Sequence, residues 1–76
     1  MDLDDFIKNF ASQFEETDVN IFAAQTKFKD LAEWSSFMAL SIIAMIDAEY
    51  GVKIKGDDIR NSSIIEELYM IVKLRI

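Results

Sequence analysis

The apolar residues near the start of the chain recur with helical spacing. One side of a helix would carry Leu3, Phe6, Ile7, Phe10 and Phe14. Three aspartates among the first five positions would lie near the N-terminus of that helix, where the helix dipole favours acids. The pattern predicts a first helix over residues 2–15.

The helical pattern weakens over residues 16–34. Polar residues interrupt the stretch, but it still contains four large apolar side chains that we expect to be buried, namely Ile21, Phe22, Phe28 and Leu31. We expect a long loop held to the core by these side chains. A loop of this length in a small domain indicates a function or a short additional helix.

A second helix is predicted to begin near Ser36. An almost continuous apolar run follows Ser35 and Ser36, continues to Tyr50 and stops at Gly51. Serine at the start and glycine just past the end are typical capping residues of a helix. The run is shorter than the roughly 18 apolar residues that a membrane-spanning helix needs, so we expect a helix of a water-soluble bundle.

Two shorter features follow the second helix. Val52 and Ile54 alternate with lysines in a segment too short for a sheet, so we expect an extended linker with both apolar side chains directed inward. Residues 57–60 are expected to form one helical turn capped by an aspartate.

The last helix is predicted from a capping box and an apolar stripe. Ser63 and Glu66 have the spacing of a capping box. The stripe of Ile65, Leu68 and Val72 continues the helix to the C-terminus. Together the elements predict an all-α bundle of three main helices and one short helix, with a long loop between the first two main helices. The chain has 76 residues, and we expect residues 1–76 to form one domain around one core.

Composition excludes several classes of function. The chain has no cysteine and no histidine, which removes disulfides, thiolate chemistry and the usual general base and metal ligand. We therefore expect no metal site and no enzyme. The net charge of −6 argues against a nucleic-acid partner and favours basic protein partners. An acidic start without an apolar segment differs from a signal peptide, so we expect a cytoplasmic protein without stable membrane association.

The second helix is apolar on more than one side. The expected core side consists of Ala39, Ile42, Ile43, Ile46 and Tyr50. The opposite side would carry Leu40, Ser41, Ala44, Met45 and Ala48, with charge confined to Asp47 and Glu49. Such a helix is expected to expose an apolar strip suited to binding a partner. The alternative is a central helix that is covered on all sides.

Several segments resemble the acyl carrier protein family. Residues 34–37, Trp-Ser-Ser-Phe, resemble the Trp-Asp-Ser-Leu form of the phosphopantetheine attachment motif. Upstream, residues 28–31 resemble a Phe-x-Asp-Leu lead-in. Downstream, four features follow in the same order as in that family. They are a helix end at Gly51, a Val-Lys-Ile linker, an acidic pair before Ile59 and a helix start with the sequence Ser-Ile-Ile-Glu-Glu-Leu. The likeness covers residues 28 to about 72.

The resemblance implies a carrier of acyl groups. A phosphopantetheinyl transferase would attach 4'-phosphopantetheine from coenzyme A to Ser36, and acyl-loading and acyl-processing enzymes would use its thiol in fatty-acid, polyketide or related biosynthesis. Ser36 is preferred to Ser35 because it keeps Gly51 in register and places Phe37 at the family's leucine. Ser35 stands where the family has aspartate. Either serine also fits a simple capping role.

The resemblance also places the partner surface on the second helix of a monomeric carrier. The expected partner-binding residues are Phe37, Met38, Leu40, Ser41, Met45 and Asp47. Acids near this helix, Glu33, Asp47 and Glu49, would meet basic patches of the partner enzymes, although ordinary solvation explains Asp47 and Glu49 equally well.

Two other functions remain open from the sequence. An unmodified helical module would dock a partner through the second helix, with the serine only capping. A small enzyme is the weakest alternative because the chain offers no evident pair of nucleophile and general base.

Overall fold

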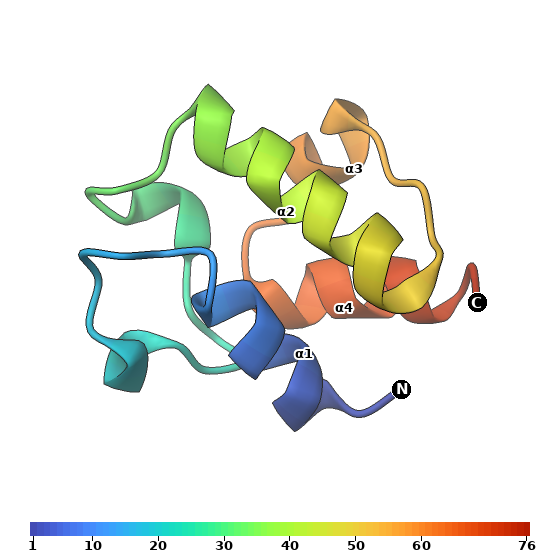
Figure 1. Cartoon of the computed structure of the whole chain (residues 1–76), viewed down its shortest axis with the longest axis horizontal. Helices are drawn as coiled ribbons and strands as arrows, with labels where there is room; N and C mark the ends of the chain where they lie inside the picture. The colour runs from blue at the N-terminus through green and yellow to red at the C-terminus, as the bar shows by residue number, and fades with distance from the viewer.

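The computed structural model describes all 76 residues and contains only helices and their connections. The elements are α1 (Leu3–Ala11), η1 (Val19–Ile21), η2 (Phe28–Asp30), α2 (Ser36–Tyr50), α3 (Gly56–Arg60) and α4 (Ile65–Lys73), where η marks a 3-10 helix. The all-α fold with three main helices, one short helix and a long first connection is confirmed. In Figure 1, α2 runs diagonally through the upper part of the view with α1 and α4 below it, and both termini lie on the same side of the molecule.

The first helix is shorter than its apolar pattern predicted. It ends at Ala11 rather than at residue 15. After Ala11 the backbone hydrogen bonds join residues three apart instead of four. They run from Gln13 N–H to Phe10 O (3.2 Å) and from Phe14 N–H to Ala11 O (3.0 Å). The Ser12 hydroxyl donates to the carbonyl of Asn9 at 2.7 Å, which satisfies one of the last carbonyls of the helix. Phe14 stays buried although it lies outside the helix.

The long loop is held by aromatic side chains, as the sequence predicted. Phe22 and Phe28 are buried, and Leu31 packs against the core. Ile21 was expected to be buried and is 50% exposed, because it ends the short η1 turn at the surface. The two 3-10 helices are the additional helical structure that the loop length suggested.

A cluster of rings joins the loop to α1 and to the start of α2. The ring centroids of Phe14 and Phe22 are 4.9 Å apart, those of Phe10 and Phe28 are 5.2 Å apart, and those of Phe28 and Trp34 are 5.1 Å apart. Pairs at these separations add attraction to the area that they bury. This cluster fixes the path of the chain into α2.

The segment after α2 follows the expected inward alternation. Val52 and Ile54 are both buried. The acid that caps α3 is Asp58, inside the helix, whose carboxylate accepts from Lys55 N–H at 2.9 Å. The expected turn over 57–60 therefore begins one residue earlier, at Gly56.

The start of α4 differs by one residue from the predicted capping box. Glu67 rather than Glu66 accepts the backbone N–H groups of Ser63 (2.6 Å) and Ile64 (3.2 Å). Glu66 instead donates its own N–H to Ala24 O at 3.0 Å, which ties the helix to the loop. The predicted stripe of Ile65, Leu68 and Val72 is fully buried.

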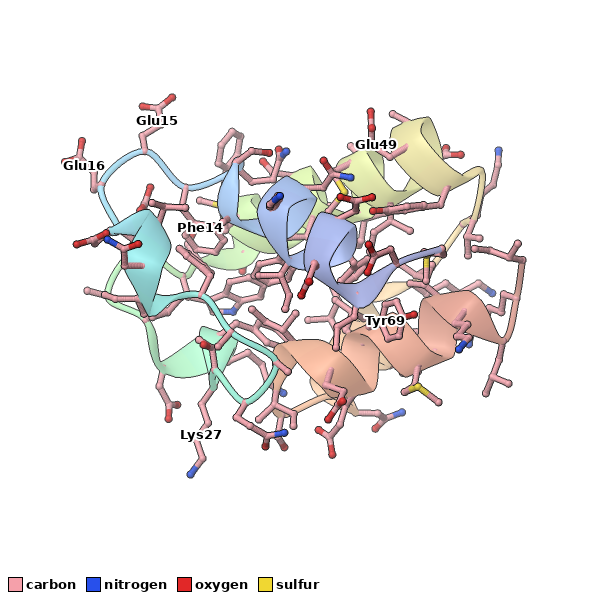
Figure 2. The ribbon with its side chains drawn as sticks, turned by 90° about the horizontal axis from the view of Figure 1, so that it is seen from below. Phe14, Glu15, Glu16, Lys27, Glu49 and Tyr69 are labelled. Carbon is pink, nitrogen blue, oxygen red and sulfur yellow. The ribbon has the colours of Figure 1, made fainter.

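The core lies where α1, α2 and α4 meet. Its completely buried side chains include Phe6, Ile42, Ile46 and Leu68. Figure 2 shows Tyr69 on α4 directed toward α1. The ring centroids of Tyr69 and Phe6 are 5.6 Å apart. None of the helices has both the length and the apolar character that a membrane span requires.

Candidate functional site

The two serines at the start of α2 have different roles in the backbone. Ser35 is the N-cap, and its Oγ accepts from Met38 N–H at 3.1 Å. Ser36 is the first residue of the helix, is exposed, and its hydroxyl forms no hydrogen bond with another residue. Ser35 therefore takes the capping role, which leaves the Ser36 hydroxyl free at the positive end of a 15-residue helix.

The far end of α2 is fixed by Gly51. This residue adopts the left-handed conformation with φ of 68°, and its N–H bonds to Asp47 O at 2.9 Å. A glycine in this conformation is the usual way to end a helix. The predicted bounds of α2, from Ser36 to Tyr50, are confirmed.

A groove of about 560 Å³ lies beside Ser36 and is called here the serine groove. Its lining comes from the η2 segment, the start of α2 and α3, and includes Trp34, Ser36, Leu40, Ile43 and Ile59. Ser36 contributes a free hydroxyl to a lining in which five of the ten residues are hydrophobic. The arrangement can accept a chain attached at Ser36 and extending along the groove.

Two cations also line the serine groove, and the sequence analysis did not select them. The ammonium of Lys29 donates to the carbonyls of Ile59 (3.3 Å) and Arg60 (3.0 Å) at the end of α3. Arg60 forms an exposed ion pair with Asp57. Lys29 holds α3 against η2 and lines the same groove as Ser36, whereas the charge of Arg60 is balanced by Asp57.

The exposed strip of α2 agrees with the predicted one at Leu40, Ala44 and Ala48 but not at Met45. Phe37 and Leu40 are 75% and 63% exposed, and Ala44 and Ala48 are exposed further along the helix. Met38 and Met45 were predicted to bind partners, which is wrong, because both are only 7% exposed and belong to the core.

The core side of α2 is correspondingly rotated. Its buried residues are Met38, Ile42, Met45 and Ile46. The other residues expected on that side, Ala39, Ile43 and Tyr50, are only partly buried, although they still pack against the core. Of the remaining predicted partner residues, Ser41 is partly buried and Asp47 is exposed.

Glu33 is tied to the loop after α1. Its carboxylate accepts from the backbone N–H groups of Glu15 (2.9 Å) and Glu16 (3.0 Å) and from the Thr17 hydroxyl (2.8 Å). Loss of hydration acts to raise its pKa, but these hydrogen bonds outweigh it and hold the pKa of Glu33 below its usual range. The side chain of Glu33 therefore fixes the loop after α1, and its contact with basic enzymes stays a prediction. Glu15, Glu16 and Glu49 project outward (Figure 2).

Other kinds of site receive no support from the geometry. No group of three or more carboxylates is arranged to hold a metal ion. The Tyr50 hydroxyl accepts from the Asn9 amide at 2.8 Å, and burial raises the pKa of this tyrosine, but no groove is formed around it. Ser36 and the serine groove are the strongest candidate site.

Comparison with known proteins identifies no relative of this chain. No protein-family model matches the chain, and searches of curated proteins and of solved structures found no match.

Proposed function

We propose that the chain is an acyl carrier protein that bears 4'-phosphopantetheine on the Oγ of Ser36. The observation that carries this proposal is the division of roles between neighbouring serines. Ser35 caps the helix, so Ser36 is free for modification without loss of the cap. The resemblance of residues 28–72 to the family points to the same serine.

The residues around Ser36 fit the group in size and chemistry. The serine groove offers apolar side chains to the uncharged part of the arm, such as Ile43 and Ile59. The N–H groups at the start of α2, and the ammonium of Lys29 in the lining of the same groove, offer positive charge to a phosphodiester at Ser36. The attached arm would supply the thiol on which acyl groups are carried, and the chain has no thiol of its own.

The attachment step needs no catalytic group from this chain. The Ser36 oxygen would form a bond to the phosphorus of coenzyme A that bears the pantetheine, and the bond from that phosphorus to the bridging oxygen would break. The leaving group is adenosine 3',5'-bisphosphate, and the serine proton passes to a base of the transferase. The free, exposed hydroxyl is what the chain contributes. We therefore place the protein among non-catalytic carriers used by acyl-loading and acyl-processing enzymes in fatty-acid, polyketide or related biosynthesis, in the cytoplasm.

The partner surface of this carrier would be mainly apolar. The first turn of α2 has no acidic residue, and Phe37 and Leu40 are the large apolar side chains that this helix exposes. A transferase would therefore recognise this helix through apolar contact, with Ser41 and Asp47 at the side of the same surface. The Ser35 that replaces the family's aspartate leaves no carboxylate next to the modified residue.

Incubation with coenzyme A and a broad-specificity phosphopantetheinyl transferase tests the proposal. The intact mass is expected to rise by one phosphopantetheinyl group in the wild type and in Ser35→Ala, and to stay unchanged in Ser36→Ala. An unmodified wild type with a native circular dichroism spectrum contradicts the proposal. Labelling that persists in Ser36→Ala shows that another residue is the site.

The exposure of Phe37 favours one second candidate, a non-covalent module that docks a partner through α2, with Ser35 as the cap and Ser36 unmodified. Absence of the added mass, together with partner binding that Phe37→Ser abolishes, would select this function.

A further inference from the structure

A second groove lies between α1 and the loop that follows it, and is called here the α1 groove. Its volume is about 430 Å³, and seven of its nine lining residues are hydrophobic. Leu3, Ile7 and Ala11 line it from α1, one on each successive turn, and Val19 and Phe22 line it from the loop. None of its lining residues belongs to the serine groove. It is therefore a separate surface feature.

The walls of the α1 groove are only partly covered by the chain itself. Phe22 and Ala11 are buried and form its floor, whereas Leu3 and Ile7 are half-buried and Val19 is 64% exposed. Ile21, on the same η1 turn as Val19, is also exposed. Contiguous apolar surface of this kind marks interaction sites more often than single exposed apolar residues do.

Acidic residues outnumber basic ones in and next to the lining of the α1 groove. Asp4 lines it directly, and Asp18 precedes Val19 in the chain. Ala24 lies at one end of the α1 groove, and its carbonyl accepts the N–H of Glu66 in the first turn of α4. The Glu66 carboxylate in turn accepts a hydrogen bond from the Gln25 amide at 3.2 Å. Lys8 is the one cation in the lining. The surroundings are therefore predominantly negative.

From these observations we infer that the α1 groove binds an amphipathic helix of a partner protein, with apolar side chains flanked by lysine or arginine. The apolar residues of the partner would enter between Ile7 and Val19, along the axis of α1, and its cations would lie against Asp4 and Glu66. Helices commonly dock in this way, with their apolar side in a hydrophobic groove. The inference is independent of the proposed modification of Ser36.

The charge around the α1 groove favours a basic helix over two other possible occupants, a hydrocarbon chain and a second copy of this chain. An uncharged hydrocarbon chain gains nothing from a carboxylate rim. A second copy of the chain carries the same net charge of −6 and is repelled at long range. A basic helix gains from both the apolar floor and the acidic rim.

The experiment is an NMR titration of the ¹⁵N-labelled full chain with a synthetic amphipathic peptide that has leucine on one side and lysine on the other. The largest amide shifts are expected at Ile7, Val19 and Phe22. Ile7→Gln and Val19→Lys are expected to weaken the affinity about tenfold or more, since each places a polar or charged group in the contact. Raising the salt from about 20 mM to about 200 mM is expected to weaken it several-fold.

Leu74→Ser is the matched control, because it removes an exposed apolar side chain outside the α1 groove and is expected to leave the affinity unchanged. Shifts centred on Phe37 and Leu40, or spread over acidic residues without the groove, overturn the inference. So do shifts that depend on protein concentration without peptide, which indicate a second copy, or equal shifts with decanol, which indicate a hydrocarbon ligand. Circular dichroism of Ile7→Gln and Val19→Lys establishes that both variants are folded.

Discussion

Asp58 and Arg75 form a two-pronged ion pair that fastens the residues after α4 to α3. Each guanidinium nitrogen, Nη1 and Nη2, lies 2.7 Å from a different carboxylate oxygen. The same carboxylate accepts from Lys55 N–H at the start of α3. Since α3 forms one side of the serine groove, this pair helps to place that side.

The ion pair predicts a loss of stability in acid. The hydrogen bonds from Arg75 and then from Lys55 hold the pKa of Asp58 below its ordinary value of 3.8. Because the pKa is depressed in the folded state, the contribution to stability is complete above the ordinary value of 3.8 and is lost as the pH falls from there through the depressed pKa. Urea unfolding of the wild type between pH 6 and pH 2.5 is expected to show this decline, alongside that of other carboxylates such as Glu33.

Asp58→Asn is the variant that isolates this contribution. It is expected to lower the urea midpoint at pH 6 and to reduce the dependence on pH below about 4. Asp57→Asn is the matched control, because its pair with Arg60 is exposed on both sides and contributes little. Equal curves for Asp58→Asn and the wild type would contradict the role given to the pair.

The neighbouring serines are expected to differ in their effect on folding. Ser35→Ala removes the hydrogen bond to Met38 N–H and should lower the free energy of unfolding by about 1 kcal/mol. Ser36→Ala removes no hydrogen bond within the chain and should change it much less. Chemical denaturation of both variants measures the difference. A larger loss for Ser36→Ala would assign the cap to the wrong serine.

Glu33 is expected to control the order of the loop after α1. In Glu33→Gln one carboxylate oxygen becomes an amide NH₂, which cannot accept a hydrogen bond, so one of the three donors loses its partner. Amide hydrogen exchange at Glu15 and Glu16 should become faster by about an order of magnitude, as expected for the loss of a charged acceptor. Glu49→Gln serves as the control, and unchanged exchange in Glu33→Gln would contradict the tether.

The two glycines are expected to respond oppositely to alanine. Gly51→Ala should cost about 1 kcal/mol, because a φ of 68° disfavours a side chain even though no atom lies within 4 Å of the added Cβ. Gly56 begins α3 with an ordinary φ, and its added Cβ would meet Arg60 only at 3.5 Å. Gly56→Ala should therefore be neutral or slightly stabilising. Thermal unfolding of both variants distinguishes these outcomes.

Phe37 is expected to matter for modification rather than for stability. Because its side chain is mostly exposed, Phe37→Ser should leave the unfolding midpoint nearly unchanged. If a transferase binds the apolar strip, the variant should show a KM raised about tenfold for the carrier, in line with the loss of one buried aromatic contact. Glu49→Gln is the control, and an unchanged KM for Phe37→Ser would place the contact elsewhere.

Local signals allowed much of the fold to be predicted from the sequence. The start and end of α2 follow from Ser35 and Gly51, whose capping roles depend only on adjacent residues. The buried stripe of α4 follows from helical spacing in the same way. The predicted end of α1 was wrong, because the true end depends on hydrogen bonds between the following loop and Glu33. These bonds start from the N–H groups of Glu15 and Glu16, which lie 18 and 17 residues before Glu33 in the chain.

The orientation of α2 was not available from its own residues. Apolar side chains surround most of this helix, so spacing alone does not say which side faces the core. Packing against α1 and α4 selects Met38 and Met45 for the interior and leaves Phe37 and Leu40 outside. Lys29 and Arg60 were missed for a similar reason, since they reach the serine groove from segments that are 31 residues apart and have no shared local pattern.

The position of Trp34 has a practical consequence. It is the chain's one tryptophan, its ring is 5.1 Å from that of Phe28, and it lines the serine groove. Its fluorescence therefore comes from a single, known place at the entrance to α2. The native protein carries its own optical reporter there, so events at Ser36 can be followed in real time without a label.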